Sequence, residues 1–135
     1  MDQAELDEVL RIAMDYFRSQ TSSEEEANKM MAALAKTVED RGSKLVHLGN
    51  YLFLVLVRGK GYVEFHTIGD YSNPKEFVKT LEMLAEYFKN IGVQVAYTYT
   101  PDNKFKRLLK FVNLKVQTYE TEVEGQKMNV FMVEL

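Results

Sequence analysis

The chain has 135 residues, of which 46% are hydrophobic and 27% are charged, and its formal net charge is −3. This length and composition fit one folded domain with its own core and argue against disorder. The small acidic charge argues against a dedicated nucleic-acid binder, since only residues 104–110 are locally basic. The absence of cysteine excludes disulfides, thiolate metal sites and a cysteine nucleophile.

Neither end of the sequence nor its middle carries a membrane signal. The amino-terminal MDQAELDEVLRI is acidic and has no apolar region of the kind found in signal peptides. The longest apolar run, LFLVLV at residues 52–57, is too short to cross a bilayer. We therefore expect a cytoplasmic protein with no membrane partner.

Two amphipathic helices are predicted within residues 4–41. The first shows apolar residues at helical spacing, namely Leu6, Val9, Leu10, Ala13, Met14 and Phe17. The second begins with a capping box formed by Ser23 and Glu26 and ends at Gly42. Its predicted inward residues are Ala27, Met30, Met31, Leu34 and Val38. We interpret the methionine pair as core filling, and a partner-binding stripe is the alternative.

Residues 44–69 change to the alternation of strands. Three antiparallel strands are predicted at 44–48, 51–58 and 62–69, joined at Gly49-Asn50 and at 59–61. The middle strand is apolar on both faces, so we expect it inside a sheet with helices on both sides.

A helix is then predicted from Asn73-Pro74, with Asn73 as its cap and Gly92 just past its end. Its inner stripe is Phe77, Leu81, Leu84 and Phe88. A strand at 93–100, a PDN turn and a helix at 104–112 follow, the last with Phe105, Leu108, Leu109 and Val112 inward.

The last two strands form a hairpin about Glu124-Gly125 and differ in polarity. Residues 115–122 are polar-rich, as edge strands are, whereas residues 127–134 are apolar on both faces. The final strand is therefore predicted to insert between 93–100 and 115–122. The expected fold is α/β (α+β): a mixed, mostly antiparallel sheet of about six strands with helices on both faces, in one domain spanning 1–135.

This order of elements, with Asn103 following the strand VQVAYTYT, resembles the GCN5-related N-acetyltransferase (GNAT) superfamily without its usual first strand. The resemblance implies that acetyl-CoA lies where strands 62–69 and 93–100 splay apart. Its pyrophosphate would lie at the helix start formed by Ser72, Asn73 and Lys75, while Asn103 would line the cofactor channel.

The loop that should bind the pyrophosphate departs from the family pattern. From Asp70 to Lys79 it has neither the glycines nor the arginine that the family uses, and Asp70 would repel phosphate. Lys75 and Lys79 could compensate, although a solvated helix face explains them equally well. We therefore expect acetyl-CoA to bind weakly, if it binds.

The resemblance also assigns catalytic positions. Glu64 lies where the family often has a general base, and strand alternation places His66 on the same face as a proton relay. A structural hydrogen bond between the two is the alternative. Leu109 occupies the position of the family's proton-donating tyrosine, which leaves Tyr97 and Tyr99 as substitutes. Two histidines without cysteine make no metal site.

Two functions stay open. The first is an acetyl-CoA-dependent N-acyltransferase acting on a small-molecule or protein amine. The second is a noncatalytic GNAT-like binding or structural module, with a protein partner or a second copy of itself, that has lost cofactor binding. The sequence resembles small GNAT-like proteins of bacteriophages in which the family motifs are eroded. Some of those proteins are virion components. The basic cluster at 104–110 would meet a phosphate, a nucleic acid or only solvent.

Overall fold

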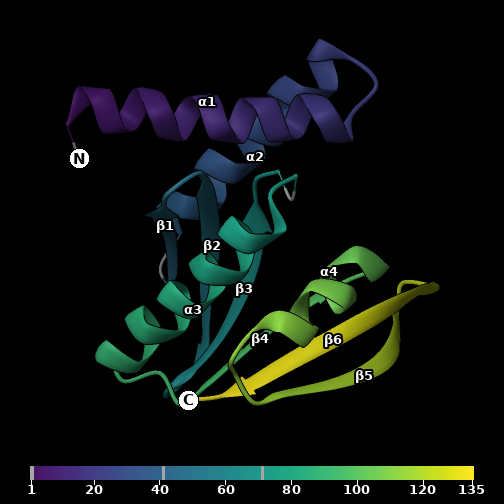
Figure 1. Ribbon diagram of the computed structural model, residues 1–135. Coiled ribbons are helices and arrows are strands. Elements are labelled where there is room, and N and C mark those ends of the chain that lie inside the picture. The colour runs from purple at the N-terminus through teal and green to yellow at the C-terminus, as the bar shows by residue number, and fades with distance from the viewer. Residues whose placement is uncertain (1, 41, 71) are drawn as a thin grey trace. The chain divides into compact units, whose positions relative to one another are not determined.

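The computed structural model describes residues 2–40, 42–70 and 72–135 (Figure 1). The described elements, in chain order, are α1 (Gln3–Gln20), α2 (Glu24–Glu39), β1 (Ser43–Leu48), β2 (Tyr51–Gly59), β3 (Tyr62–Ile68), α3 (Pro74–Asn90), β4 (Val95–Thr100), α4 (Asn103–Leu108), the 3-10 helix η1 (Leu109–Phe111), β5 (Val116–Val123) and β6 (Gln126–Glu134). The predicted elements are thus present and begin and end close to the expected residues.

The strands form one six-stranded sheet in the order β1-β2-β3-β4-β6-β5. The final strand β6 pairs antiparallel with β4 on one side and with β5 on the other. Its predicted central position is confirmed, as is the mixed, mostly antiparallel sheet, in which β3 and β4 pair in parallel. The chain reverses from β5 to β6 with positive φ at Glu124 and Gly125 (50° and 79°), a turn geometry that matches strand twist.

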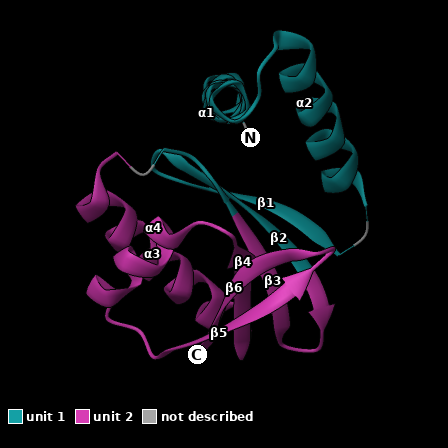
Figure 2. Ribbon diagram, turned by 90° about the vertical axis from the view of Figure 1, so that its right-hand side faces the viewer, with its two compact units in different colours: residues 1–56, 67–70 teal, residues 57–66, 71–135 magenta. Residues whose placement is uncertain are grey.

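The described chain divides into two compact units, residues 1–56 with 67–70 and residues 57–66 with 71–135 (Figure 2). In the first unit, α1 and α2 pack with strand residues around a buried cluster of Val9, Ile12, Ala13, Phe17, Ala27, Leu52 and Ile68. This cluster shows how the apolar stripes of the two helices and the strands make a core. That the whole chain forms a single domain stays a prediction.

Fewer side chains of helix α2 pack into the core than predicted. Ala27 is fully buried and Met31 and Leu34 pack partly, but Met30 is 40% exposed. Met30 lies on the flank of the stripe because Ala27, Met31 and Leu34 already define the inward direction at helical spacing. The prediction that Met30 points inward is therefore wrong. At the helix start, Ser23 accepts the Glu26 N–H at 3.2 Å, while the Glu26 carboxylate bonds Ser22 instead of closing the expected box.

Close approach at the end of β3 requires glycine. At Gly69, φ is +157°, and an added Cβ would lie 2.5 Å from Cδ1 of Tyr51. The Tyr51 hydroxyl donates to the Asp70 carbonyl at 2.7 Å, so the ring lies against this segment. The chain leaves β3 in a direction that any larger residue at position 69 would disturb. Tyr71, in the loop predicted to bind pyrophosphate, lies outside the described residues.

In the second unit, α3 and α4 lie together on one face of its strands (Figure 2). Asn73 caps α3 by accepting the Glu76 N–H at 3.2 Å, and Pro74 takes the first helical position, both as predicted. The rings of Phe77 and Phe105 lie 5.8 Å apart and join the two helices. Both packed faces are mainly apolar, as their spacing predicts, and their buried residues are Phe77, Thr80, Leu81, Leu84, Ala85, Phe88, Phe105 and Leu108.

Candidate functional site

The parallel pairing of β3 with β4 stops partway along both strands. The register joins Tyr62 to Val95, Val63 to Ala96 and Glu64 to Tyr97 and then ends, although β3 runs to Ile68 and β4 to Thr100. Figure 1 shows the two strands diverging. Among the described residues, the pairing of these two strands goes no further than Glu64 and Tyr97. This divergence is the splay that the resemblance predicts.

A polar cluster surrounds Glu64 at the last paired position. The Oε1 atom of Glu64 accepts from the Tyr97 hydroxyl at 2.8 Å and from Arg58 Nε at 3.2 Å. The Oε2 atom lies 2.5 Å from Nε2 of His66. Glu64 itself is 5% exposed. The predicted pair of Glu64 and His66 is thus brought into contact, and two further residues complete the carboxylate's coordination.

The cluster keeps Glu64 ionised. Burial by itself raises the pKa of this carboxyl, but hydrogen bonds from His66, Tyr97 and Arg58 outweigh burial, so its pKa lies below the ordinary value. A carboxylate with three donors and a lowered pKa is a weak base. Its geometry suits orienting a neighbour more than accepting a proton itself.

The two tyrosines of β4 have different roles in the cluster. Burial, followed by the hydrogen bond to Glu64, raises the pKa of Tyr97 to about 12. Burial and the charge of Glu64 also raise the pKa of Tyr99. The Tyr99 ring meets the His66 ring edge-on at 5.1 Å, and its hydroxyl has no hydrogen-bond partner within the described residues. The Tyr97 hydroxyl therefore donates to Glu64, whereas the Tyr99 hydroxyl is available to a ligand.

The His66 side chain is 30% exposed, whereas that of Glu64 is 6% exposed. When Nε2–H donates to the Glu64 carboxylate, the imidazole is held in the tautomer whose Nδ1 carries a lone pair. Among the residues that the structure describes, Nδ1 has no partner. A carboxylate-oriented imidazole with an open nitrogen is a general arrangement for removing a proton from a bound molecule.

The predicted pyrophosphate site at the start of α3 has few backbone donors. Pro74 has no N–H, Glu76 gives its N–H to the Asn73 side chain, and Phe77 gives its N–H to the Asn73 carbonyl at 3.1 Å. Of residues 74–77, Lys75 alone keeps an uncommitted amide. Ser72 and the side chains of Lys75 and Lys79 are exposed, and neither lysine has an ion pair within the described residues. The site thus offers cationic side chains more than a backbone cradle.

Asn103 is the first residue of α4, where the resemblance places it, and it has a partner that sequence patterns did not indicate. Its Oδ1 accepts from Nδ2 of Asn129 at 3.2 Å. Asn129 is buried on β6, two residues before Phe131, on a face that is otherwise apolar. A polar residue in an apolar alternation was the available signal for a side chain that orients Asn103.

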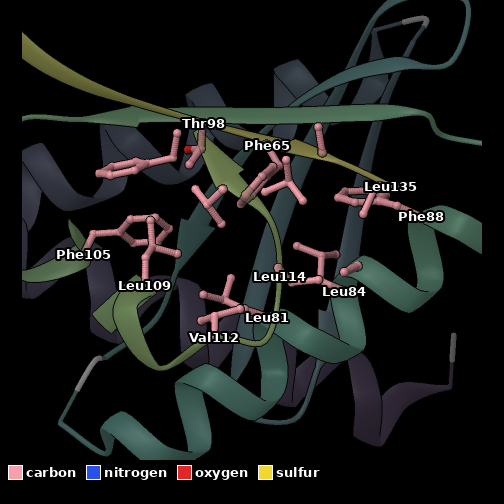
Figure 3. A pocket seen from close by; sticks show the side chains of 15 residues that line it. Phe65, Leu81, Leu84, Phe88, Thr98, Phe105, Leu109, Val112, Leu114 and Leu135 are labelled. Carbon is pink, nitrogen blue, oxygen red and sulfur yellow. The ribbon is translucent and has the colours of Figure 1, made fainter. Parts of the chain in front are cut away.

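A small apolar cavity lies on the α3 and α4 side of the sheet (Figure 3). Its volume is about 30 Å³ and Thr98 is the polar residue among those lining it. Leu109, at the position of the family's tyrosine, is one of the lining residues, so this position offers no proton donor. The cavity is a packing gap of the core, since it is too small for a cofactor arm.

Arg58 is, with Asn129, a site residue that sequence reasoning missed. It lies next to the end of the apolar strand β2, six residues before Glu64 across a short glycine turn, and this position in a hairpin was the signal for it. Among the described residues, no group of three or more histidine, aspartate or glutamate side chains could hold a metal ion. No described helix is both long and apolar enough to cross a membrane.

Comparison with known proteins relates the chain to others by structure alone. No protein-family profile and no curated protein sequence matches it. Its structure is similar to spermidine N-acetyltransferase from Vibrio cholerae, with a TM-score of 0.63 and 12% identity over 95% of this chain and 89% of that one. It is also similar to the ribosomal-protein-S18-alanine N-acetyltransferase from Escherichia coli, with a TM-score of 0.59 and 12% identity over 99% and 90%.

A third similar structure is a Bacillus subtilis acetyltransferase in complex with CoA, with a TM-score of 0.54 and 15% identity over 76% of this chain and 83% of that one. Identities this low relate folds and not activities. The six-stranded sheet, the divergence after Glu64 and these similarities agree. The chain has the fold of the GNAT acetyltransferases.

Proposed function

We propose that the protein is an acyl-CoA-dependent N-acyltransferase that acts on a primary amine at the divergence of β3 and β4. The observation that carries this proposal is the contact of His66 with Glu64, of which Glu64 lies at the last paired position of the two strands. Removing a proton from an ammonium group is the step that such a dyad can perform.

In this scheme His66 is the base and Glu64 is a positioning residue, which refines the sequence-based assignment of the base to Glu64. Glu64 already accepts three hydrogen bonds and its pKa is lowered, so it holds a proton poorly. His66 is half-buried and presents Nδ1. Tyr99, whose hydroxyl is unengaged beside His66, is the phenol available to return a proton to a leaving group.

The cofactor would supply an acetyl group as a thioester. Lys75 and Lys79 would hold its phosphates by charge, with Ser72 and the Lys75 amide beside them and Asn103 lining the channel. Because Pro74, Glu76 and Phe77 offer no amide, we expect weaker binding than a glycine-rich loop gives.

The test of the dyad is acetyl transfer to a panel of amines. His66→Gln should lower kcat/KM about 100-fold with little change in KM, because a general base contributes this much to the chemical step. His47→Gln is the matched control, since His47 bonds the Gly49 carbonyl in the other unit. Equal activity of the His66 variant and the wild type would overturn the assignment.

The test of the cofactor site is calorimetric titration with acetyl-CoA. Lys75→Ala combined with Lys79→Ala should abolish the weak binding, whereas Lys29→Ala with Lys36→Ala on α2 should preserve it. Tight binding that survives the first double substitution would show that the cofactor is held elsewhere.

The start of α3 favours one second candidate. A noncatalytic GNAT-like binding or structural module needs no phosphate site. At the start of α3 the N–H groups of Glu76 and Phe77 donate to Asn73, and Pro74 has no N–H. Such a module, for example a phage virion or accessory protein, would use a protein partner or a second copy of itself. Absence of acetyl-CoA binding by the wild type would select it.

A further inference from the structure

The sheet face that carries Glu64 and His66 is lined by aromatic and thioether side chains. The strand registers and ring contacts place them in rows across four strands of the second unit. One row is Glu64, Tyr97, Met132 and Gln117. The next contains His66, Tyr99, Val130 and Tyr119, in which His66 and Tyr99 meet ring to ring. Tyr62 continues the face, with its ring 5.2 Å from Tyr97.

This face is partly open, in contrast to its reverse side. On the reverse side Ala96, Thr98, Phe131 and Val133 are buried towards α3 and α4. On the open side Tyr97, Tyr99, Val130 and Met132 are each intermediate in exposure, and Tyr119 is 44% exposed. Neither α3 nor α4 lies over these side chains. An apolar and aromatic surface of this kind, bordered by an acid–base pair, is typical of ligand sites.

We propose that this face, the tyrosine-methionine face, binds a primary amine carried on an aromatic ring, with the amine at His66 and the ring over Tyr99, Val130, Met132 and Tyr119. The inference rests on the proposed function and names its acceptor class. Tyrosine rings attract an ammonium group and also stack with an aromatic body. Methionine side chains adapt to the shape of such a body.

The side chains over which the ring would lie carry no formal charge, which disfavours a polyamine there. Glu64 is its buried carboxylate, and Arg58 already compensates that charge. Glu134 lies at the exposed end of β6, beside the row of Tyr62 and Val95. A spermidine-like chain would bring several ammonium groups to a surface made mainly of tyrosine, valine and methionine. One amine on an apolar body needs a single polar partner, which His66 and Glu64 supply.

The experiment uses the whole protein with methyl-labelled methionine, observed by NMR without any acyl-CoA. The probe is 2-phenylethylamine. We expect its ring to shift the methyl signals of Met128 and Met132, while those of Met30 and Met83, which are 40% and 48% exposed elsewhere, stay in place. Equal shifts at all four methionines would overturn the proposal.

Matched ligands and variants sharpen the test. Spermidine, 2-phenylethanol and a short peptide with an amino-terminal alanine should each bind at least about tenfold more weakly, and tighter binding of any of them would reject the proposed class. Tyr119→Ala should weaken 2-phenylethylamine several-fold, whereas Phe111→Ala, which removes a ring 74% exposed on η1, should not. Equal affinity of the Tyr119 variant would also reject it.

Failure of this inference is distinguishable from failure of the proposed function. Site-specific shifts without acetylation of 2-phenylethylamine after acetyl-CoA is added would reject the enzyme and keep the binding site. Acetylation of spermidine in preference to 2-phenylethylamine would keep the enzyme and reject the acceptor class.

Discussion

The protein contains two glutamate–arginine pairs that look alike in chemistry and differ in surroundings. Between α1 and α2, Arg18 donates to Glu24 at 2.8 Å, with side chains 53% and 58% exposed. In the sheet, Arg58 donates to Glu64 at 3.2 Å, and the Glu64 side chain is 6% exposed. Both carboxyls have a lowered pKa. The direction of a pKa shift therefore does not tell a surface pair from a buried site.

What separates the two pairs is the largest influence on each carboxyl. For Glu24 it is the hydrogen bond from Arg18, which lowers the pKa. For Glu64 it is burial, which raises the pKa and has to be overcome by His66, Tyr97 and Arg58 together. Burial alone would disfavour the charge of Glu64, and the three hydrogen-bond donors outweigh that penalty.

The two pairs should differ most when each glutamate is removed in turn. Glu64→Ala should cost about 3 kcal/mol of unfolding free energy, because it leaves Tyr97, His66 and Arg58 without their shared acceptor. Glu24→Ala should leave the urea unfolding curve nearly unchanged, since its pair is exposed. Similar losses in both variants would show that burial does not distinguish the pairs.

The buried site can also be broken by acid. Because the folded pKa of Glu64 is lowered, its contribution to stability is complete above the unfolded value of 4.5 and is lost as pH falls through the folded value. The difference in unfolding free energy between wild type and Glu64→Gln should therefore shrink from pH 7 to pH 3. A difference that is constant over this range would contradict the lowered pKa.

The two tyrosines of β4 should differ in how much their hydroxyl groups contribute to stability. Tyr97→Phe should cost about 1.5 kcal/mol, because its hydroxyl donates to the Glu64 carboxylate at 2.8 Å. Tyr99→Phe is the matched control two residues along the same strand, and its hydroxyl has no partner within the described residues. Thermal unfolding of both variants should show the loss only at Tyr97.

Local patterns predicted most of the fold. The apolar faces of residues 127–134 predicted the position of β6 between β4 and β5. Ser23 and Asn73 predicted the starts of the two helices that they cap. Such signals depend on spacing along one segment. The prediction that Met30 points inward was wrong, because residue spacing defines the direction of an apolar stripe but not its width. The residues packed against the helix determine that width.

The candidate site could be predicted only in part. Alternation along one strand placed Glu64 beside His66. The partnership of Glu64 with Tyr97 depends on the register of two parallel strands 33 residues apart in sequence, and that register follows from the tertiary fold. The same holds for Asn129 beside Asn103. Alternation predicted the side-chain contact within one strand, whereas these side-chain pairs between elements could not be predicted from local patterns.

The smallest expected effect concerns the cap of α3, the counterpart in the second unit of the Ser23 cap on α2. Asn73→Ala should cost about 1 kcal/mol, because the Glu76 N–H loses its acceptor at 3.2 Å. Asn73→Gly should cost less, because glycine also serves as a cap residue. Thermal unfolding of both variants measures the difference, and an unchanged melting curve for Asn73→Ala would remove this cap from the account. The same substitution returns an amide to the helix start, so acetyl-CoA should bind Asn73→Ala no more weakly than it binds the wild type, even though the variant is less stable.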